Sequence, residues 1–185
     1  MLSRTPFLTC LLLLALLPAS LQVLAAETHD PATYFFDETW GDLQEELATA
    51  RAEGKQGILI FFELDECPFC HRMKRSVLNQ PEVQAYFRKH FRIFTIDIEG
   101  DVEMVDFQGN ATTQKDFAFK ANRVRATPVM VFYDLDGKAI TRYTGATSGM
   151  QEFLWLGQFI TEGHYRNMRF TKYKRQQARA ARQAR

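Results

Sequence analysis

The sequence predicts an α/β fold, in which helices cover both faces of a central mixed β-sheet. Short apolar runs alternate with segments of helical periodicity, in the order helix, strand, helix, strand, helix, strand, strand, helix. The strand–helix–strand unit at 57–98 predicts a parallel pair, and the hairpin at 129–143 predicts an antiparallel one. Together they give a sheet of mixed direction.

The first half of the chain supplies two strands and the helices around them. An amphipathic helix is expected from Trp40 to Ala52, and Gly54 fits its C-terminal cap. An apolar run follows at 58–62, and then a helical pattern that restarts at Pro81. The second strand is expected from Phe91 to Ile98.

The second half supplies the hairpin and the last predicted helix. Residues 100–112 are polar and are expected to form a loop or insertion, and 113–121 return to a helical pattern. Pro128 stands before a β-prone run, where proline belongs at the first residue of a strand or at a sheet edge. A tight turn at 134–137 joins this run to a second strand, and an amphipathic helix spans 150–161.

Cys67 and Cys70 lie where the first strand gives way to a helix. Pro68 suits the first helical position, so Cys67 falls at the helix cap and Cys70 one turn inside. Unpaired backbone N–H groups and the helix dipole stabilise a thiolate at such a cap, and His71 adds nearby positive charge. We therefore expect the pKa of Cys67 to lie below the free value of about 8.5.

The cysteine pair allows two interpretations. The pair is either structural, as a plain disulfide or half of a zinc site, or it is a redox-active dithiol. Zinc would need a second Cys-x-x-Cys or a His pair, and the sequence has neither. A disulfide that closes so short a loop adds little stability, so redox chemistry is favoured and no metal is expected.

Residues 1–25 are interpreted as a secretory signal peptide. Arg4 precedes an apolar core at 7–17, and Val23 to Ala25 offers small residues for cleavage. This predicts a periplasmic or secreted protein, whereas an uncleaved leader would anchor it in a membrane. Cleavage removes Cys10 and leaves one closely spaced pair, which suits a working dithiol in an oxidising compartment.

The rest of the chain divides into a polar lead-in at 26–36, one domain at 37–163 and a basic tail at 164–185. The tail holds eight Lys or Arg and no acidic residue, although the whole chain has a net charge of +1. We expect a solvated, partly helical tail, with docking on the body, an acidic partner or a membrane surface as alternatives. The structured basic face with stacking aromatics that nucleic-acid binding needs is missing, so no nucleic-acid partner is expected.

Three motifs occur together in this chain: Cys67-Pro68-Phe69-Cys70 after a strand, Thr127-Pro128 before a strand, and Asp136-Gly137 in the following hairpin. In this combination the chain resembles the thioredoxin fold. The stretches CPFCHRM at 67–73, NQPEV at 79–83 and RATP at 125–128 make it most similar to the periplasmic SoxW-type thioredoxin-like proteins. The resemblance covers roughly Asp37 to Tyr173.

This resemblance implies a role for each motif residue. Cys67 would be the attacking cysteine and Cys70 the resolving one. Pro128 would be cis and would lie against the dithiol, with Thr127 offering its backbone to a bound polypeptide. The residues expected to shape the site and bind substrate are Pro68, Phe69, Thr127 and Pro128.

One position departs from the family pattern. Many thioredoxins carry a buried Asp on the strand, six residues before the first cysteine, and Phe61 stands at that position here. Glu63 is the nearest carboxylate. Glu63 and His71 are therefore the candidates for tuning the pKa of the dithiol.

The implied activity is thiol–disulfide exchange on periplasmic or secreted proteins that bear disulfides. The SoxW-type resemblance implies a reductant that a membrane thiol–disulfide electron carrier recharges, and we expect a monomer. The Cys67–Cys70 disulfide is the only redox group expected, with no separate cofactor.

Two other functions are kept as alternatives. Cys67 to His71 also matches Cys-x-x-Cys-His, the attachment signature of haem c, with His71 as one axial ligand and Met104 or Met130 as the other. The core strand before the motif argues against the haem interpretation, because chains that carry haem c are expected to be mostly helical. The third function is a non-catalytic binding module that uses the tail or 100–112, and the intact dithiol argues against it.

Overall fold

The computed structural model describes residues 27–184. The predicted signal peptide at 1–25 lies outside these residues, so its presence and cleavage stay predictions. Within 27–184, no helix combines the length and the apolar character that crossing a membrane requires.

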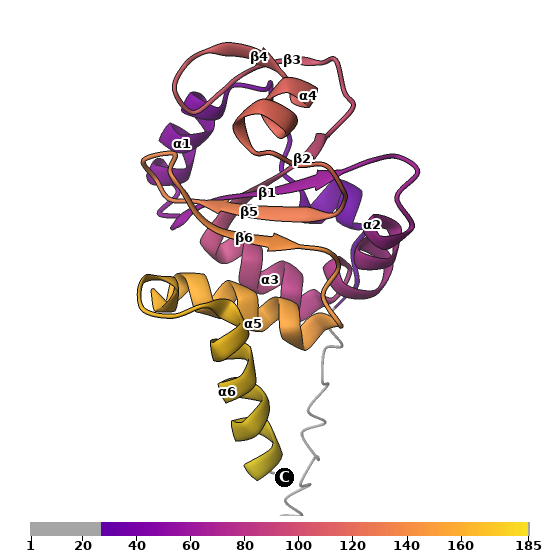
Figure 1. Ribbon diagram of the computed structural model, residues 1–185, viewed down its shortest axis with the longest axis vertical. Coiled ribbons are helices and arrows are strands. Elements are labelled where there is room, and N and C mark those ends of the chain that lie inside the picture. The colour runs from indigo at the N-terminus through magenta and orange to yellow at the C-terminus, as the bar shows by residue number, and fades with distance from the viewer. Residues whose placement is uncertain (1–26, 185) are drawn as a thin grey trace, which may run out of the picture.

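A four-stranded sheet forms the centre of the molecule (Figure 1). Its strands, in order across the sheet, are β2 (Phe91–Asp97), β1 (Gly57–Glu63), β5 (Val129–Tyr133) and β6 (Ala139–Thr144). β1 pairs in parallel with β2 and antiparallel with β5, and β5 pairs antiparallel with β6. The predicted α/β fold with a mixed sheet is confirmed.

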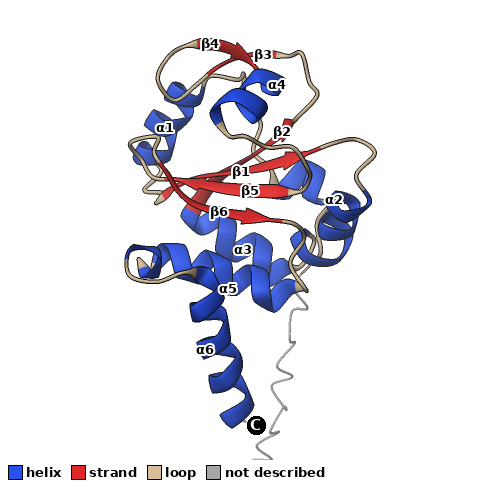
Figure 2. Ribbon diagram, viewed as in Figure 1, coloured by secondary structure: helices blue, strands red, loops and turns tan. Residues whose placement is uncertain are grey.

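Helices cover both faces of this sheet (Figure 2). One face carries α3 (Pro81–His90) and α5 (Met150–Thr161), and the other carries α1 (Leu43–Ala52) and α4 (Gln114–Asp116), which a π-helical turn continues at Phe117–Ala121. Gly54 follows the end of α1 with a φ of 68°. Glycine adopts this left-handed conformation without strain, which explains why the helix ends there.

Alternate residues of β1 face two separate cores. Leu59 and Phe61 pack on the side of α3 and α5. Ile58, Ile60 and Phe62 pack on the side of α1 and α4. Because successive side chains of a strand point to opposite faces, a strand that is covered on both faces must be apolar at every position.

Residues 100–112, expected as a loop or insertion, contribute to a short hairpin instead. β3 (Glu103–Val105) pairs antiparallel with β4 (Ala111–Thr113). The carboxylate of Asp106 holds the turn by accepting a hydrogen bond from the backbone N–H of Asn110, at 2.9 Å. Strands of three residues with polar members are too short to show a period of two in the sequence.

The lead-in packs against the domain that was expected to begin at residue 37. A π-helical turn at Pro31–Phe35 brings Phe35 and Phe36 into the core beside α3 and the dithiol helix, and Phe35 is fully buried. Packing of the domain therefore starts several residues before the expected boundary.

The basic tail forms a helix, α6 (Phe170–Gln183), that projects from the body after a 3₁₀ turn at His164–Arg166 (Figure 1). Tyr173 docks the first turns of α6, because its side chain packs into the core and is only 3% exposed. The expected solvated, partly helical tail is thus a nearly continuous helix with one anchored end.

Replacing Phe35 by alanine is expected to lower the free energy of unfolding by about 3–5 kcal/mol, because the change removes buried apolar surface and leaves a cavity. Urea unfolding at neutral pH measures the effect. The control is Glu38→Ala at an exposed position, with an expected change below about 0.5 kcal/mol. A small effect in both variants would show that the lead-in does not belong to the cooperative unit.

Candidate active site

The dithiol occupies the junction of β1 with α2 (Pro68–Met73). Cys67 is the N-cap residue of α2, and its Sγ accepts a hydrogen bond from the backbone N–H of Cys70 at 3.1 Å. Pro68 takes the first helical position, where the missing N–H removes no bond. The sequence-based placement of both cysteines is confirmed.

Cys67 and Cys70 form a disulfide in this structure. Both are largely buried, with Cys67 4% and Cys70 1% exposed. Cys70 and Met73 face the core, and α2 runs on into a π-helical turn at Lys74–Leu78. Cys67 is therefore slightly more exposed than Cys70.

Phe69, between the cysteines, points outward. Its ring is 55% exposed, and the guanidinium carbon of Arg72 lies 5.2 Å from the ring centre. A cation over an aromatic face restrains the ring without covering all of it. Phe69 thus offers an exposed apolar surface next to the disulfide.

The second predicted motif lies at the same end of the sheet. Phe62, near the end of β1, pairs with Val129, the first residue of β5. This register places Thr127 and Pro128 beside the segment that leads into α2. The Thr127–Pro128 peptide bond is cis, Pro128 is buried and Thr127 is half-buried.

Glu63, the carboxylate predicted to tune the dithiol, forms an ion pair with Lys74. Its carboxylate lies 2.7 Å from Nζ of Lys74, in the turn that follows α2. Phe61, two residues earlier on the same face of β1, is buried in the cluster that contains Cys67 and Cys70. Phe61 of β1 therefore belongs to the same core as the disulfide, while the carboxylate of Glu63 already has a cationic partner.

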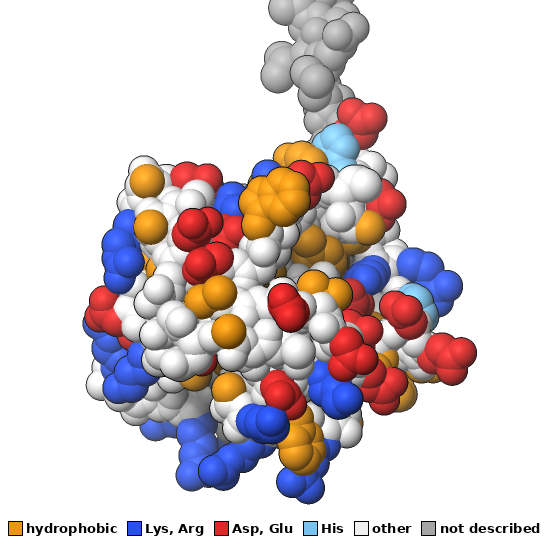
Figure 3. Space-filling view, turned by 90° about the horizontal axis from the view of Figure 1, so that it is seen from above, with side chains coloured by type: hydrophobic (Ala, Val, Ile, Leu, Met, Phe, Trp, Pro, Cys, Tyr) orange, Lys and Arg blue, Asp and Glu red, His pale blue; other side chains and the backbone are white. Residues whose placement is uncertain are grey.

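His71 contacts the loop before the dithiol. Its Nε2 lies 2.7 Å from the carbonyl oxygen of Asp65, and its side chain is exposed. Asp65 and Glu66 are exposed as well. Figure 3 shows acidic side chains gathered on the right of the view, the side on which α2 lies in Figure 1.

The loop at 145–149 forms a wall of the site, because it contacts both Pro128 and the dithiol helix. The sequence did not predict this position. The N–H of Gly145 donates to the carbonyl oxygen of Pro128 at 2.9 Å. The hydroxyl of buried Thr147 lies 3.4 Å from Sδ of Met73, one turn after Cys70. Only the glycines at 145 and 149 marked this segment as a loop, and its neighbours come from distant parts of the chain.

A buried carboxylate, that of Glu152, lies behind this loop. Its oxygens accept hydrogen bonds from Tyr143, from the N–H and hydroxyl of Ser148, and from Lys174 of α6. The sequence pattern gave no signal for this cluster, because its members come from β6, the loop, α5 and α6.

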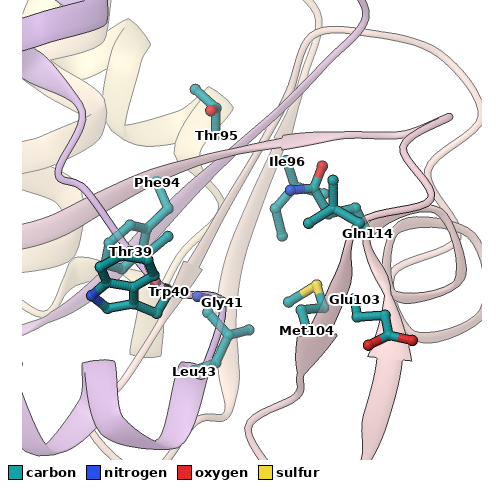
Figure 4. Close-up of a pocket in the computed structure, with 11 residues that line it drawn as sticks. Thr39, Trp40, Gly41, Leu43, Phe94, Thr95, Ile96, Glu103, Met104 and Gln114 are labelled. Carbon is teal, nitrogen blue, oxygen red and sulfur yellow. Dashed lines mark hydrogen bonds between the residues drawn. The ribbon is translucent and has the colours of Figure 1, made fainter.

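A cavity of about 240 Å³ (Figure 4) is lined by residues of the core on the α1 side, whereas both cysteines belong to the other core. Trp40, fully exposed before α1, stands at this cavity, with Phe94 of β2 and Met104 of β3 among the other lining residues. None of the residues predicted to form the dithiol site lines this cavity.

The residues considered for metal or haem do not form a metal-binding cluster among the described residues. Within 27–184, no three His, Cys, Asp or Glu side chains gather in a way that suits a metal ion. Met104 belongs to the core on the α1 side, whereas Met130 lies in the core that contains both cysteines. His71 has its Nε2 engaged by the carbonyl oxygen of Asp65.

The geometry suits reversible chemistry at sulfur. When the disulfide is reduced, a thiolate at Cys67 keeps the N–H of Cys70 as a hydrogen-bond donor and gains from the partial positive charge of the helix start. Cys70 is within bonding distance of Cys67, since the two already form a disulfide. A pair in this arrangement can accept or release two electrons.

Comparison with known proteins identifies related folds. Residues 43–160 match a family model described as a thioredoxin-like domain. A thioredoxin-fold protein from Helicobacter pylori is 22% identical, with 69% of this chain and 87% of that chain covered and a TM-score of 0.57. A thioredoxin from Thermus thermophilus is 24% identical, with coverages of 63% and 82% and a TM-score of 0.50.

A DsbH oxidoreductase is 18% identical, with coverages of 72% and 90% and a TM-score of 0.51. The search of curated proteins found no match. At these identities the solved structures establish the likeness of fold.

Glu152 makes the stability of the protein sensitive to acid. Burial raises the pKa of Glu152, but hydrogen bonds from Lys174, Ser148 and Tyr143 outweigh burial and lower the pKa from 4.5 to about 2. A carboxyl group whose pKa is lowered by folding stabilises the fold above its unfolded pKa, and that stabilisation is lost as the pH falls to the folded pKa.

We therefore expect the free energy of unfolding to decrease between about pH 4.5 and pH 2, with on the order of 3 kcal/mol due to this one group. Urea titrations across this range measure the decrease. Glu152→Gln should flatten the profile, and an unchanged slope in the variant would contradict the assignment.

Proposed function

The chain belongs to the thioredoxin-like domain family, and from this premise we propose that it performs thiol–disulfide exchange on protein substrates. The Cys67–Cys70 pair is the redox-active group. The observation that carries the proposal is the position of Cys67, whose Sγ caps α2 and accepts the N–H of Cys70. This is where a thiolate is stabilised and can act as a nucleophile.

The exchange proceeds in two displacements at sulfur. The Cys67 thiolate attacks one sulfur of a substrate disulfide, forms a mixed disulfide and releases the other substrate sulfur as a thiolate. The Cys70 thiolate then attacks Sγ of Cys67, which restores the Cys67–Cys70 disulfide and releases the second substrate thiolate. Two electrons pass from the protein to the substrate, and the reverse sequence oxidises a dithiol.

The neighbouring motif residues bind the substrate chain. Phe69 supplies an exposed apolar surface beside the disulfide. Thr127 and Pro128 lie at the same end of the sheet, and half-buried Thr127 offers its backbone to an extended segment. Pro68 fixes the start of α2 and so the direction of Cys67.

His71 and Glu63 influence the dithiol indirectly. The contact of His71 with the Asp65 carbonyl ties α2 to the preceding loop. The Glu63–Lys74 ion pair ties the end of β1 to the turn after α2. Both contacts hold the segment that carries Cys67.

We further propose that the protein works as a monomeric reductant in the periplasm or outside the cell. Support comes from the apolar leader in the first 25 residues and from the sequence resemblance to SoxW-type proteins. An oxidised Cys67–Cys70 pair then needs a donor, and a membrane thiol–disulfide electron carrier is the proposed one. No cofactor other than this pair takes part in the proposed reaction.

Cys67→Ser is expected to abolish the reduction of insulin disulfides by dithiothreitol above the uncatalysed rate, because the nucleophile is lost. Cys70→Ser should still attack disulfides but should stop at the mixed disulfide, since the resolving thiol is missing. Non-reducing electrophoresis and mass spectrometry detect the trapped species. Full turnover by Cys67→Ser would refute the assignment of the nucleophile.

The direction of exchange is tested by the reduction potential of the mature protein in glutathione buffers. A reductant is expected to have a potential near that of thioredoxin, about −270 mV. A value near −120 mV, as for a strong oxidant, would reverse the proposed direction. The absorption spectrum of the same sample tests the haem alternative, because covalently attached haem gives a Soret band and would exclude dithiol exchange.

A further inference from the structure

We propose that Glu152 and Lys174 are positioning residues for substrate binding at the dithiol, because they hold the 145–149 loop in place. The inference rests on the proposed function for its kinetic consequence. It assigns a role in the site to α6, the basic C-terminal helix, which lies outside the residues that match the family model.

The loop contacts both elements of the site. Gly145 bonds to the carbonyl oxygen of Pro128, and Thr147 lies against Met73 on the inner face of the dithiol helix. Thr147 is buried although its side chain is polar. A displacement of this loop would therefore change the surface next to Pro128 where an extended substrate is proposed to lie.

The loop is held from behind by the carboxylate of Glu152. Oε2 accepts the backbone N–H of Ser148 at 3.1 Å and also the Ser148 hydroxyl. Oε1 accepts the Tyr143 hydroxyl at 2.9 Å and Nζ of Lys174 at 2.7 Å. Each oxygen thus has two donors, and the carboxylate joins β6, the loop, α5 and α6.

Lys174 balances the charge of this buried group. Glu152 is 5% exposed, and an ionised carboxylate at such a position needs a cationic partner and full hydrogen bonding. Tyr173, the residue before Lys174, anchors α6 in the core and so fixes where the ammonium group lies. Hydrogen bonds to a charged group are also stronger than neutral ones.

Removing either partner disturbs the loop in a specific way. In Lys174→Met the carboxylate keeps only the neutral donors Tyr143 and Ser148. In Glu152→Gln one carboxylate oxygen becomes an NH₂ group, which has to face an existing donor, so a bond to Ser148 or to Lys174 is lost. Both changes loosen the 145–149 loop.

A purely local role for Glu152 predicts a different result. Glu152 lies in the first turn of α5, where an acidic side chain commonly accepts backbone N–H groups and stabilises the helix start. If that were its whole role, Glu152→Gln would lower stability and leave substrate binding by the folded protein unchanged.

The experiment compares Glu152→Gln and Lys174→Met with the matched control Lys172→Met. Lys172 has the same side chain, lies two residues away on α6 and is exposed. Insulin reduction with dithiothreitol gives kcat and KM, and the rate of iodoacetamide alkylation reports the Cys67 thiolate. All measurements are made where each variant is fully folded by circular dichroism.

We expect KM for insulin to rise about fivefold in both test variants, as is typical of coupling between packed elements. The alkylation rate should stay within about twofold of the wild-type rate, because the cap of α2 is not altered. The control should match the wild type. An unchanged KM in Glu152→Gln, or an equal rise in Lys172→Met, would overturn the positioning role.

Amide hydrogen exchange tests the same proposal without a substrate. Exchange at the Gly145 N–H should be about tenfold faster in both test variants, because its bond to Pro128 opens more often. The Leu59 amide in the central strand should keep its wild-type rate. Unchanged exchange at Gly145 would refute the proposal, whereas failure of the wild type to reduce insulin would refute the proposed function alone.

Discussion

The pairing of β1 with two neighbours of opposite direction is the constraint on which the site depends. β1 runs parallel to β2 and antiparallel to β5, so the last residues of β1 and the first residues of β5 lie at the same end of the sheet. At that end of the sheet, the helix that carries the cysteines follows β1, and Pro128 directly precedes β5. Because β1 is buried on both faces, a slip of one residue would move every apolar side chain to the wrong core. The register that brings the two motifs together is therefore fixed by packing far from the sulfur atoms.

Within this frame, the backbone of α2 gives the dithiol a stabilising contact. Phe61, at the position where many thioredoxins carry an Asp, belongs to the core that contains both cysteines, and Glu63 pairs with Lys74. The N–H of Cys70 and the start of α2 favour a thiolate at Cys67. Phe61 therefore offers no carboxylate that could take a proton from Cys70.

The sequence was sufficient for those parts of the molecule whose signal is local. The apolar run of β1 predicts a strand, and the proline after Cys67 predicts the start of a helix. The Thr127-Pro128 pair predicts the start of another strand. The hairpin of β3 and β4 was not predicted, because strands of three residues are too short to show the alternation of apolar and polar side chains. The burial of Phe35 was missed for another reason. It lies in a short lead-in that shows neither a strand nor a helix period, and its core neighbours come from distant parts of the chain.

The basic tail shows why composition cannot assign roles to charges. The sequence presents its Lys and Arg residues as equivalent, and a solvated helix is the simplest interpretation. The structure distinguishes Lys174, whose ammonium group lies on the buried Glu152 carboxylate, from Lys172 and Arg175, which are exposed. An exposed charge contributes little to stability, whereas a cation that neutralises a buried carboxylate is costly to remove. Lys174 reaches Glu152 from the docked end of α6, where Tyr173 is buried and Phe170 packs against Tyr143 and Phe159.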